Sequence, residues 1–273
     1  MTGLKEMELI NRALKMVKGN SSLILKPIGD IHLGASNCDY AYLVNLLKWV
    51  KKTKNCYVIG MGDYCDAIYG RDKRHDVEAT DLRFNSPEKQ ANELYRLFKP
   101  IADENRLVGL LTGNHEDSVR KIAGIDITRV LCSRLGVPYL GMSAFVGLTF
   151  ERNGKKVRQD RVLVYAHHGY FGGRDKGSKI SNLMKISRAY EADIYLVGHC
   201  HDLYSSVEDK ITSSNGKLTK HRVVYGLTGS LLKTVTEGGR SYGEDAGYYP
   251  MRTGTISIKI NVDEQPLGLH VSE

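Results

Sequence analysis

The chain has 273 residues, 41% hydrophobic and 26% charged, with a net charge of +8, which excludes a disordered protein and favours a polyanionic partner. No apolar run approaches the roughly 20 residues that span a bilayer, and charged residues near the N-terminus leave no signal-peptide core, so we expect neither membrane insertion nor secretion. Five cysteines without a Cys-x-x-Cys pair argue against a disulfide framework and favour the cytoplasm.

The N-terminal part predicts a helix, then a strand, then a second helix. Apolar residues in 4–18 recur at helical spacing, so we expect an N-terminal helix within residues 1–20. Residues 23–28 form an apolar run that leads into Gly29-Asp30-Ile31-His32. Residues 42–52 again have helical spacing, and we expect their Trp49, the only tryptophan of the chain, to face the core.

A polar stretch interrupts the pattern after the second apolar run, residues 56–59, which leads into Asp63. Residues 66–87 hold Arg71 and Arg74, and we interpret them as a substrate-facing insert, with a plain solvated loop as the alternative. Ser86-Pro87-Glu88 is typical of a helix start, and we expect that helix to run to about residue 103.

The second half combines one more helix, a hairpin and a glycine-rich loop. Residues 118–135 predict one helix, and Asn153-Gly154 predicts a hairpin turn between strands at 145–150 and 157–165. Residues 169–179 form a basic loop that can bring Arg174, Lys176 or Lys179 to a phosphate, unless it is a solvated linker. Apolar runs at 203–207, 223–227 and 255–262 predict antiparallel strands, and no linker divides the single expected domain, residues 1–273.

Five apolar runs of the chain each end in Asp, Asn or His. Such side chains meet at one edge when the strands belong to an α/β sheet. A pair of metal ions that hydrolyses phosphate esters needs mixed carboxylate and imidazole ligands, with one carboxylate shared. The residues that supply this set are Asp30, His32, Asp63, Asn114, His167, His199 and His201.

Each of these segments is a weak signal alone, because a lone Asp-x-His or Gly-Asn-His-Glu is common. Five in order, each after an apolar run, are far from chance, and six of the nine histidines fall in them. The order Asp-x-His, Gly-Asp-x-x-Asp, Gly-Asn-His-Glu, His, Gly-His-x-His resembles the calcineurin-like metallophosphoesterase superfamily over about residues 23–230.

The resemblance implies a fold and a set of roles. The fold would be a sandwich of two mixed β-sheets flanked by helices, with four layers in the order α/β/β/α. Asp30, His32, Asp63 and His201 would bind one divalent ion, and Asp63 would bridge to a second. The second ion would also be held by Asn114, His167 and His199. A bridging hydroxide would attack the phosphate, and His115 would act on the leaving group, so that the catalytic candidates are His115, Asp63 and Asn114.

Three places in the sequence are ambiguous or depart from the pattern of the family. His167 and His168 are adjacent, and only one should be a ligand; we expect His167, because it follows its strand directly, and assign His168 to the substrate with Arg174, Arg71 and Arg74. Ala67 stands where phosphoprotein phosphatases carry a phosphate-binding Arg, which argues against that activity. Tyr64 lies near the position of an iron ligand in purple acid phosphatases, but we interpret it as structural.

The functional prediction is a phosphodiesterase or nuclease that acts on nucleic acid (DNA or RNA) or nucleotides with two divalent ions. Manganese is expected from the resemblance, and iron, zinc and nickel suit the same ligands. The alternatives are a phosphomonoesterase or small-nucleotide phosphatase and, in another class, a catalytically inert nucleic-acid-binding subunit. Cys200, between two ligand histidines, is expected to face away from the metals.

Overall fold

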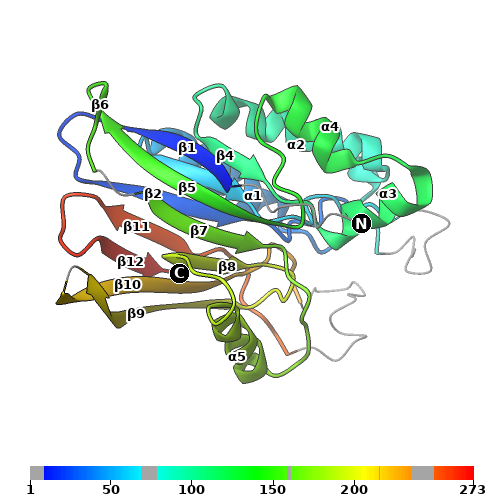
Figure 1. The fold of residues 1–273 in the computed structure, drawn as a ribbon. Coiled ribbons are helices and arrows are strands. Elements are labelled where there is room, and N and C mark those ends of the chain that lie inside the picture. The colour runs from blue at the N-terminus through cyan, green and yellow to red at the C-terminus, as the bar shows by residue number, and fades with distance from the viewer. Residues whose placement is uncertain (1–8, 69–78, 159–160, 215, 235–248) are drawn as a thin grey trace, which may run out of the picture.

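The fold is known from a computed structural model that describes all residues except 1–8, 69–78, 159–160, 215 and 235–248. Two mixed β-sheets lie face to face in the described residues (Figure 1). The larger sheet has the strand order β1 (Leu9–Met16), β5 (Ser143–Arg152), β7 (Val162–His167), β8 (Ile194–Val197), β10 (Lys217–Thr228) and β9 (Leu203–Ser214), and β6 (Lys155–Lys156) pairs with β5. The smaller has the order β12 (Gly268–Ser272), β11 (Ser257–Asn261), β2 (Ser22–Ile28), β3 (Cys56–Gly60) and β4 (Leu107–Leu110).

Helices cover the outer faces of both sheets. The smaller sheet is covered by α1 (Tyr40–Lys52), α2 (Pro87–Ala102), α3 (Asn114–Ala123) and α4 (Ile127–Leu135), with the short η1 (Leu82–Phe84) at the edge. The larger sheet is covered by α5 (Lys176–Ile186), which Figure 1 shows on the opposite side of the molecule from α2, α3 and α4. These four layers confirm the predicted α/β/β/α sandwich.

The hydrophobic core has three parts because each sheet buries both of its faces. The largest lies between the sheets, where Leu25 and Ile59 of the smaller sheet belong to the same buried cluster as Val164 and Leu196 of the larger. Two further clusters lie under the helices, one around Phe98 of α2 and one around Leu183 of α5. Burial on both faces explains why the strands read as continuous apolar runs.

The strand directions bring the polar loops together. Strands β2, β3 and β4 are parallel to one another, and so are β7 and β8 in the other sheet. The carboxyl ends of parallel strands lie on the same edge of a sheet, so the loops after these five strands gather at one end of the sandwich. These five loops carry the Asp, Asn and His residues that follow the five apolar runs of the sequence.

The expected N-terminal helix is wrong over the described residues, since residues 9–16 form strand β1, parallel to β5. Its side chains alternate, with Leu14 and Met16 buried and Ala13 and Lys15 exposed. The apolar residues at 10 and 14 fit a helical period together with 17 and an alternation together with 16, and pairing with β5, more than 130 residues later, selects the strand.

Two other expectations are corrected and two are confirmed. The single helix expected over 118–135 is two helices, because Gly124 adopts a left-handed φ of 71° that ends α3, and Asp126 caps α4. Trp49 is 42% exposed on the outer side of α1 instead of facing the core. Ser86 caps α2 with Pro87 as its first residue, and the Asn153-Gly154 hairpin between β5 and β6 has positive φ at both turn residues, as predicted.

Lys26 in β2 is a buried cation whose charge should make stability depend on pH. Its Nζ donates to the Thr255 carbonyl at 2.8 Å and to Ser257 Oγ at 2.9 Å. Burial lowers the pKa of Lys26 from 10.5 to about 8, so the unfolded chain binds more protons between these values and stability should rise with pH across that window.

We expect the free energy of unfolding of the wild type to rise by about 3 kcal/mol between pH 8 and pH 10.5 relative to Lys26→Met, which lacks the titrating group. Urea titrations of both proteins at several pH values measure the difference. Parallel pH profiles would contradict the assignment of a lowered pKa to Lys26.

Candidate metal centre

The polar loops place two groups of ligand-type side chains next to each other, and a third, His32, Asp66 and His115, overlaps the first. The first group is Asp30, His32 and His201, from the loops after β2 and β8. The Nε2 atoms of His32 and His201 are 3.3 Å apart, and Asp30 Oδ1 lies 3.4 Å from His201 Nε2. Two imidazole nitrogens and a carboxylate oxygen that converge in this way form a donor set that suits a divalent ion.

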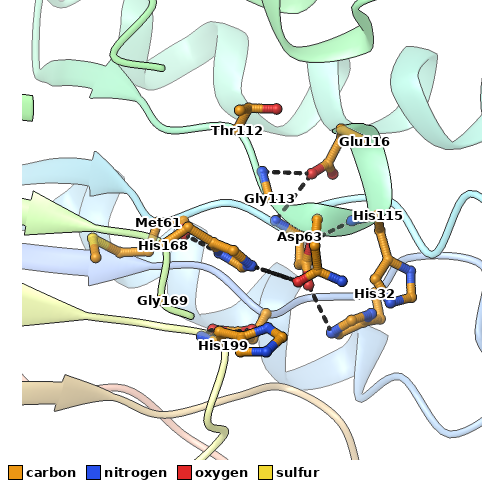
Figure 2. Close-up of polar contacts among 12 residues, drawn as sticks. His32, Met61, Asp63, Thr112, Gly113, His115, Glu116, His168, Gly169 and His199 are labelled. Atoms are coloured by element: carbon orange, nitrogen blue, oxygen red, sulfur yellow. Dashed lines mark hydrogen bonds and ion pairs between the residues drawn. The ribbon is translucent and has the colours of Figure 1, made fainter. Parts of the chain in front are cut away.

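The second group is Asp63, His168 and His199, with Asn114 beside it. His168 Nε2 lies 3.3 Å from Asp63 Oδ2 and 2.9 Å from Asn114 Oδ1. His168 Nδ1 is 2.8 Å from the Met61 carbonyl, which can only accept, so Nδ1 carries the proton and Nε2 is directed toward the group (Figure 2). A backbone carbonyl that fixes one ring nitrogen is a common support for a metal-binding histidine.

Asp63 lies between the two groups. Its Oδ2 is 3.3 Å from His168 Nε2 in the second group and 3.8 Å from His32 Nε2 in the first, as Figure 2 shows. Asp63 is 1% exposed, so its charge faces these side chains rather than water. A single buried carboxylate next to both groups is the arrangement that a shared ligand of two ions requires.

Electrostatics keep most of these groups in the protonation state that binds a cation. Burial alone would raise the pKa of Asp63, but His168, His115 and His32 hold it well below its ordinary value, so the carboxylate stays ionised. Burial lowers the pKa of His32 and of His199, which leaves their imidazoles neutral at pH 7. Asp63 raises the pKa of His168 to about 10 against the effect of burial, so binding of an ion there would release a proton.

The backbone at these positions has an uncommon conformation. Eight described residues other than glycine have a positive φ, and five of them belong to the two groups: Asp30, His32, Asp63, His199 and His201. Their φ angles lie between 47° and 65°, the left-handed region that L-residues rarely adopt. Strained backbone of this kind concentrates at functional sites because the surrounding structure holds it in place.

His167 and His168 have different surroundings, and the preference for His167 finds no support in the geometry. His167 Nδ1 accepts a hydrogen bond from the Gly169 backbone N–H at 2.7 Å, and its ring lies 5.3 Å from that of Tyr170. His168, expected to contact the substrate, is fully buried and belongs to the second group. Adjacent residues of an extended chain point to opposite sides, so only one of them can face the metal groups.

A profile described as calcineurin-like phosphoesterase matches residues 28–203, which include all of these ligand-type residues. The chain belongs to the calcineurin-like phosphoesterase family. Members of this family bind two metal ions and are generally hydrolases of phosphate esters. The two groups joined by Asp63 therefore fit the family both in number and in the chemistry of the donor atoms.

Solved structures resemble this chain only distantly. Zinc-bound Vps29 from Entamoeba histolytica is 13% identical, with a TM-score of 0.39, and the match covers 92% of this chain and 98% of that one. GAP50 of Plasmodium is 10% identical with a TM-score of 0.44 (92% and 88% covered). The NAD nucleotidase of Haemophilus influenzae is 11% identical with a TM-score of 0.40 (92% and 49% covered). No curated protein matched the sequence.

The remaining sequence predictions have mixed outcomes. Arg174 is exposed on the loop before α5. Arg71 and Arg74 lie outside the described residues, as do residues 69–78 of the expected insert 66–87. Tyr64 is buried against Phe98 in the core beneath α2, which agrees with a structural role. Cys200 is buried in the cluster beneath α5, so it faces away from the two groups as expected.

Glu116 of α3 supports the backbone around the candidate metal centre. Its carboxylate accepts hydrogen bonds from the backbone N–H groups of Asp63, Cys65 and Gly113 at 3.1, 2.8 and 3.0 Å. Figure 2 shows those from Asp63 and Gly113. Burial, followed by the charge of Asp63, raises the pKa of Glu116 to about 7. Gly113 leaves no room for a side chain, because a Cβ there would lie 2.0 Å from Asp63 Oδ1. The two residues fix the position of Asp63.

His115 lies at the side of the first group and contacts Asp63, Asp66 and His32. Its backbone N–H donates to Asp63 Oδ1 at 2.9 Å, and its ring Nδ1 donates to the Asp66 carbonyl at 2.5 Å. The ring lies edge-on to that of His32, with the centroids 4.5 Å apart. The Asp66 carboxylate is 3.7 Å from the Nδ1 atoms of both histidines, so it contributes to the field around them. The loop after β3 therefore orients His115.

Lys179 of α5 is a supporting residue that the sequence did not reveal in this role. The sequence suggested a phosphate contact, but Lys179 is 2% exposed, and its Nζ donates to the Cys200 carbonyl at 3.0 Å and to Asp202 Oδ2 at 2.5 Å. Cys200 and Asp202 flank His201, so the lysine ties the His199–His201 loop to α5. The signal in the sequence was Asp202 itself, a carboxylate directly after the histidine pair.

Replacing Lys179 with methionine should loosen this loop. The variant leaves the mostly buried carboxylate of Asp202 without its cation, and we expect a loss of about 2–4 kcal/mol in the free energy of unfolding. We also expect a 10- to 100-fold weaker affinity for the added metal, because supporting residues orient the ligands. Denaturant titration and metal titration by calorimetry measure the two effects.

The matched control for this prediction is Lys185→Met, which removes an exposed cation from the same helix. Lys185→Met should leave the free energy of unfolding and the affinity for the added metal unchanged within error. If Lys179→Met lowers stability but binds metal as tightly as the wild type, the lysine supports the fold and not the metal ligands.

None of the helices in the described part of the chain is both long and apolar enough to cross a membrane.

Proposed function

We propose that this chain is a two-metal phosphodiesterase that acts on nucleic acid or nucleotides. The observation that carries the proposal is the position of Asp63, a buried carboxylate within 3.3 and 3.8 Å of imidazole nitrogens from two complete donor groups. Asp30, His32 and His201 would hold one ion, and His168, His199 and Asn114 the other, with Asp63 shared. Manganese is the expected metal, on the ground of the donor types and the resemblance.

When bound, two such ions neutralise the phosphoryl oxygens and lower the pKa of a water molecule so that hydroxide is available at neutral pH. The protein residues then set the geometry. Glu116 and Gly113 keep Asp63 in place, and Lys179 keeps the His199–His201 loop in place. Such preorganisation matters because the barrier rises steeply when reacting atoms are displaced by even about 1 Å.

We assign His115 to the leaving group. Its Nδ1 carries a proton that the Asp66 carbonyl accepts, so Nε2 is the ring atom that can exchange a proton with a leaving oxygen. The alkoxide of a nucleotide is a poor leaving group. Proton donation to the leaving oxygen should therefore speed the hydrolysis of a nucleotide diester more than that of an ester with a good leaving group. The preference for nucleic acid or nucleotides also rests on the net charge of +8, since phosphate contacts with Lys and Arg dominate such binding.

The test compares two chromogenic substrates, bis(4-nitrophenyl) phosphate and 4-nitrophenyl phosphate, with metal-stripped protein to which Mn²⁺ is returned. We expect faster turnover of the diester, with both activities lost in Asp63→Ala. A preference for the monoester would overturn the phosphodiesterase proposal in favour of a phosphomonoesterase. If the protein binds metal but hydrolyses neither ester and neither DNA nor RNA, the result would favour an inert binding subunit.

A further inference from the structure

Strand β9 forms one edge of the larger sheet (Figure 1). It pairs with β10 along its 12 residues, and no strand of the described residues pairs with its other side. A free edge of this length offers a row of backbone N–H and C=O groups to another strand. This edge is therefore a candidate surface for the addition of a strand from a partner.

Three exposed aliphatic side chains lie on one face of the hairpin of β9 and β10. Val207, Ile211 and Leu218 are 38, 63 and 79% exposed. Alternate residues of one strand, and directly paired residues of two strands, point to the same side of a sheet. Val207 pairs with Val224, which is buried between the two sheets. Ser213, the partner of Leu218, follows Val207 at even spacing. All three aliphatic side chains therefore face the side of the smaller sheet and remain uncovered there.

The middle of β9 carries three consecutive charges, Glu208, Asp209 and Lys210. Asp209 is matched within its own chain, because its Oδ1 lies 3.1 Å from Arg222 Nε of β10. Glu208 and Lys210 point to the other side of the sheet and form no ion pair in the described residues; Lys210 Nζ lies 5.9 Å from the centroid of the Tyr225 ring. Opposite charges two positions apart complement each other when a strand pairs antiparallel with a copy of itself.

We propose that β9 pairs antiparallel with β9 of a second copy of this chain, about a two-fold axis at Asp209, so that two larger sheets join into one. Residues at equal distances before and after the axis then lie opposite each other. Glu208 of each copy faces Lys210 of the other, and Val207 faces Ile211. Each contact occurs twice because the interface is two-fold. The exposed aliphatic side chains of the two copies cover one another on one face, and the unmatched charges pair on the other.

The charges select this register over the two nearest ones. An axis at Glu208 or at Lys210 would place two unmatched like charges directly opposite each other. The axis at Asp209 also brings two carboxylates together, but each has Arg222 of its own chain beside it. Charged side chains on an edge strand discourage pairing with strands whose charges do not match. The same charges that exclude most other strands therefore favour a second copy of β9.

The two candidate metal centres lie away from this interface. Leu203 begins β9 close behind His201, and Asp209 lies about 20 Å further along the strand, at roughly 3.3 Å per residue. The two-fold axis then places the His199–His201 loops of the two copies on opposite sides, about 40 Å apart. The dimer therefore leaves both centres outside the interface and does not depend on the proposed function.

Sedimentation velocity of the full chain over a range of concentrations tests the dimer. We expect the wild type to reach twice the chain mass of 30.5 kDa. Glu208→Lys and Lys210→Glu each turn both attractive pairs into repulsive ones, so each should weaken the dimer by about tenfold or more. The double variant Glu208→Lys/Lys210→Glu restores both pairs in reverse, at the net charge of the wild type, and should dimerise as the wild type does. An equimolar mixture of the two single variants should form a mixed dimer for the same reason.

The matched control is Glu191→Lys, the same change at an exposed position outside β9, which should dimerise as the wild type does. A wild type that stays monomeric at every concentration overturns the proposal. Single variants that dimerise as tightly as the wild type overturn it as well, because β9 is then not the interface. A double variant and a mixture that both stay dissociated rule out the register with its axis at Asp209.

Discussion

Replacing Asp63 with alanine should remove both metal ions and lower kcat/KM by at least about 10⁴-fold, because its buried carboxylate lies next to imidazoles of both groups of ligands. Elemental analysis after dialysis against Mn²⁺ measures the ions, and hydrolysis of bis(4-nitrophenyl) phosphate measures the rate. Circular dichroism checks that the fold persists, since Asp63 also accepts the backbone N–H of His115.

Two further variants make this experiment specific. Asp63→Asn keeps an oxygen for the His115 N–H but removes the negative charge, so we expect a folded protein with weakened binding of both ions. Asp209→Ala removes a carboxylate on β9 that pairs with Arg222, and it should bind metal and turn over as the wild type does. If Asp63→Ala still holds one ion at full occupancy with measurable turnover, the carboxylate is not shared.

His168→Asn should lose the second ion and at least about a thousandfold in kcat/KM, whereas His167→Asn should remain within about tenfold of the wild type. The reason is the orientation of the two rings. His168 Nε2 faces Asp63 and Asn114, while His167 Nδ1 accepts the Gly169 N–H. The two substitutions have the same chemistry at adjacent positions, so each is the control for the other.

Metal stoichiometry of the two variants decides between the histidines more directly than the rate. One ion per chain in His168→Asn and two in His167→Asn are the expected values. The reverse pattern would show that the imidazole selected from the sequence, His167, is the ligand and that the loop after β7 rearranges when metal binds.

The sequence predicted which loops meet at the candidate metal centre better than it predicted the arrangement of side chains within it. Asp30, Asp63 and His201 could be predicted because each follows a buried strand, and the chain direction then places all of them at one edge of the sandwich. The choice between His167 and His168 could not be made this way. It depends on whether β7 ends one residue earlier or later, and the carbonyl of Met61, more than 100 residues away, decides which ring is anchored.

Long-range contacts also explain the errors in the fold. The apolar residues of 9–16 satisfy two periodicities, and the free edge of β5 is what favours a strand there. Trp49 was expected on the core face of its helix, but α1 has four other apolar residues that fill this inner face. Lys179 resembled a phosphate ligand in a basic loop until the fold paired it with Asp202, 23 positions later.

The left-handed backbone at five candidate ligand positions lowers the stability of the fold while it serves the site. Each such residue costs on the order of 1 kcal/mol relative to glycine, so the five together equal a large part of the 5–15 kcal/mol that stabilises a typical domain. Selection for thermostability alone would therefore favour glycine at the less buried of these positions, His199 and His201, and would weaken the candidate metal centre. A library screened for heat resistance needs a simultaneous screen for metal content.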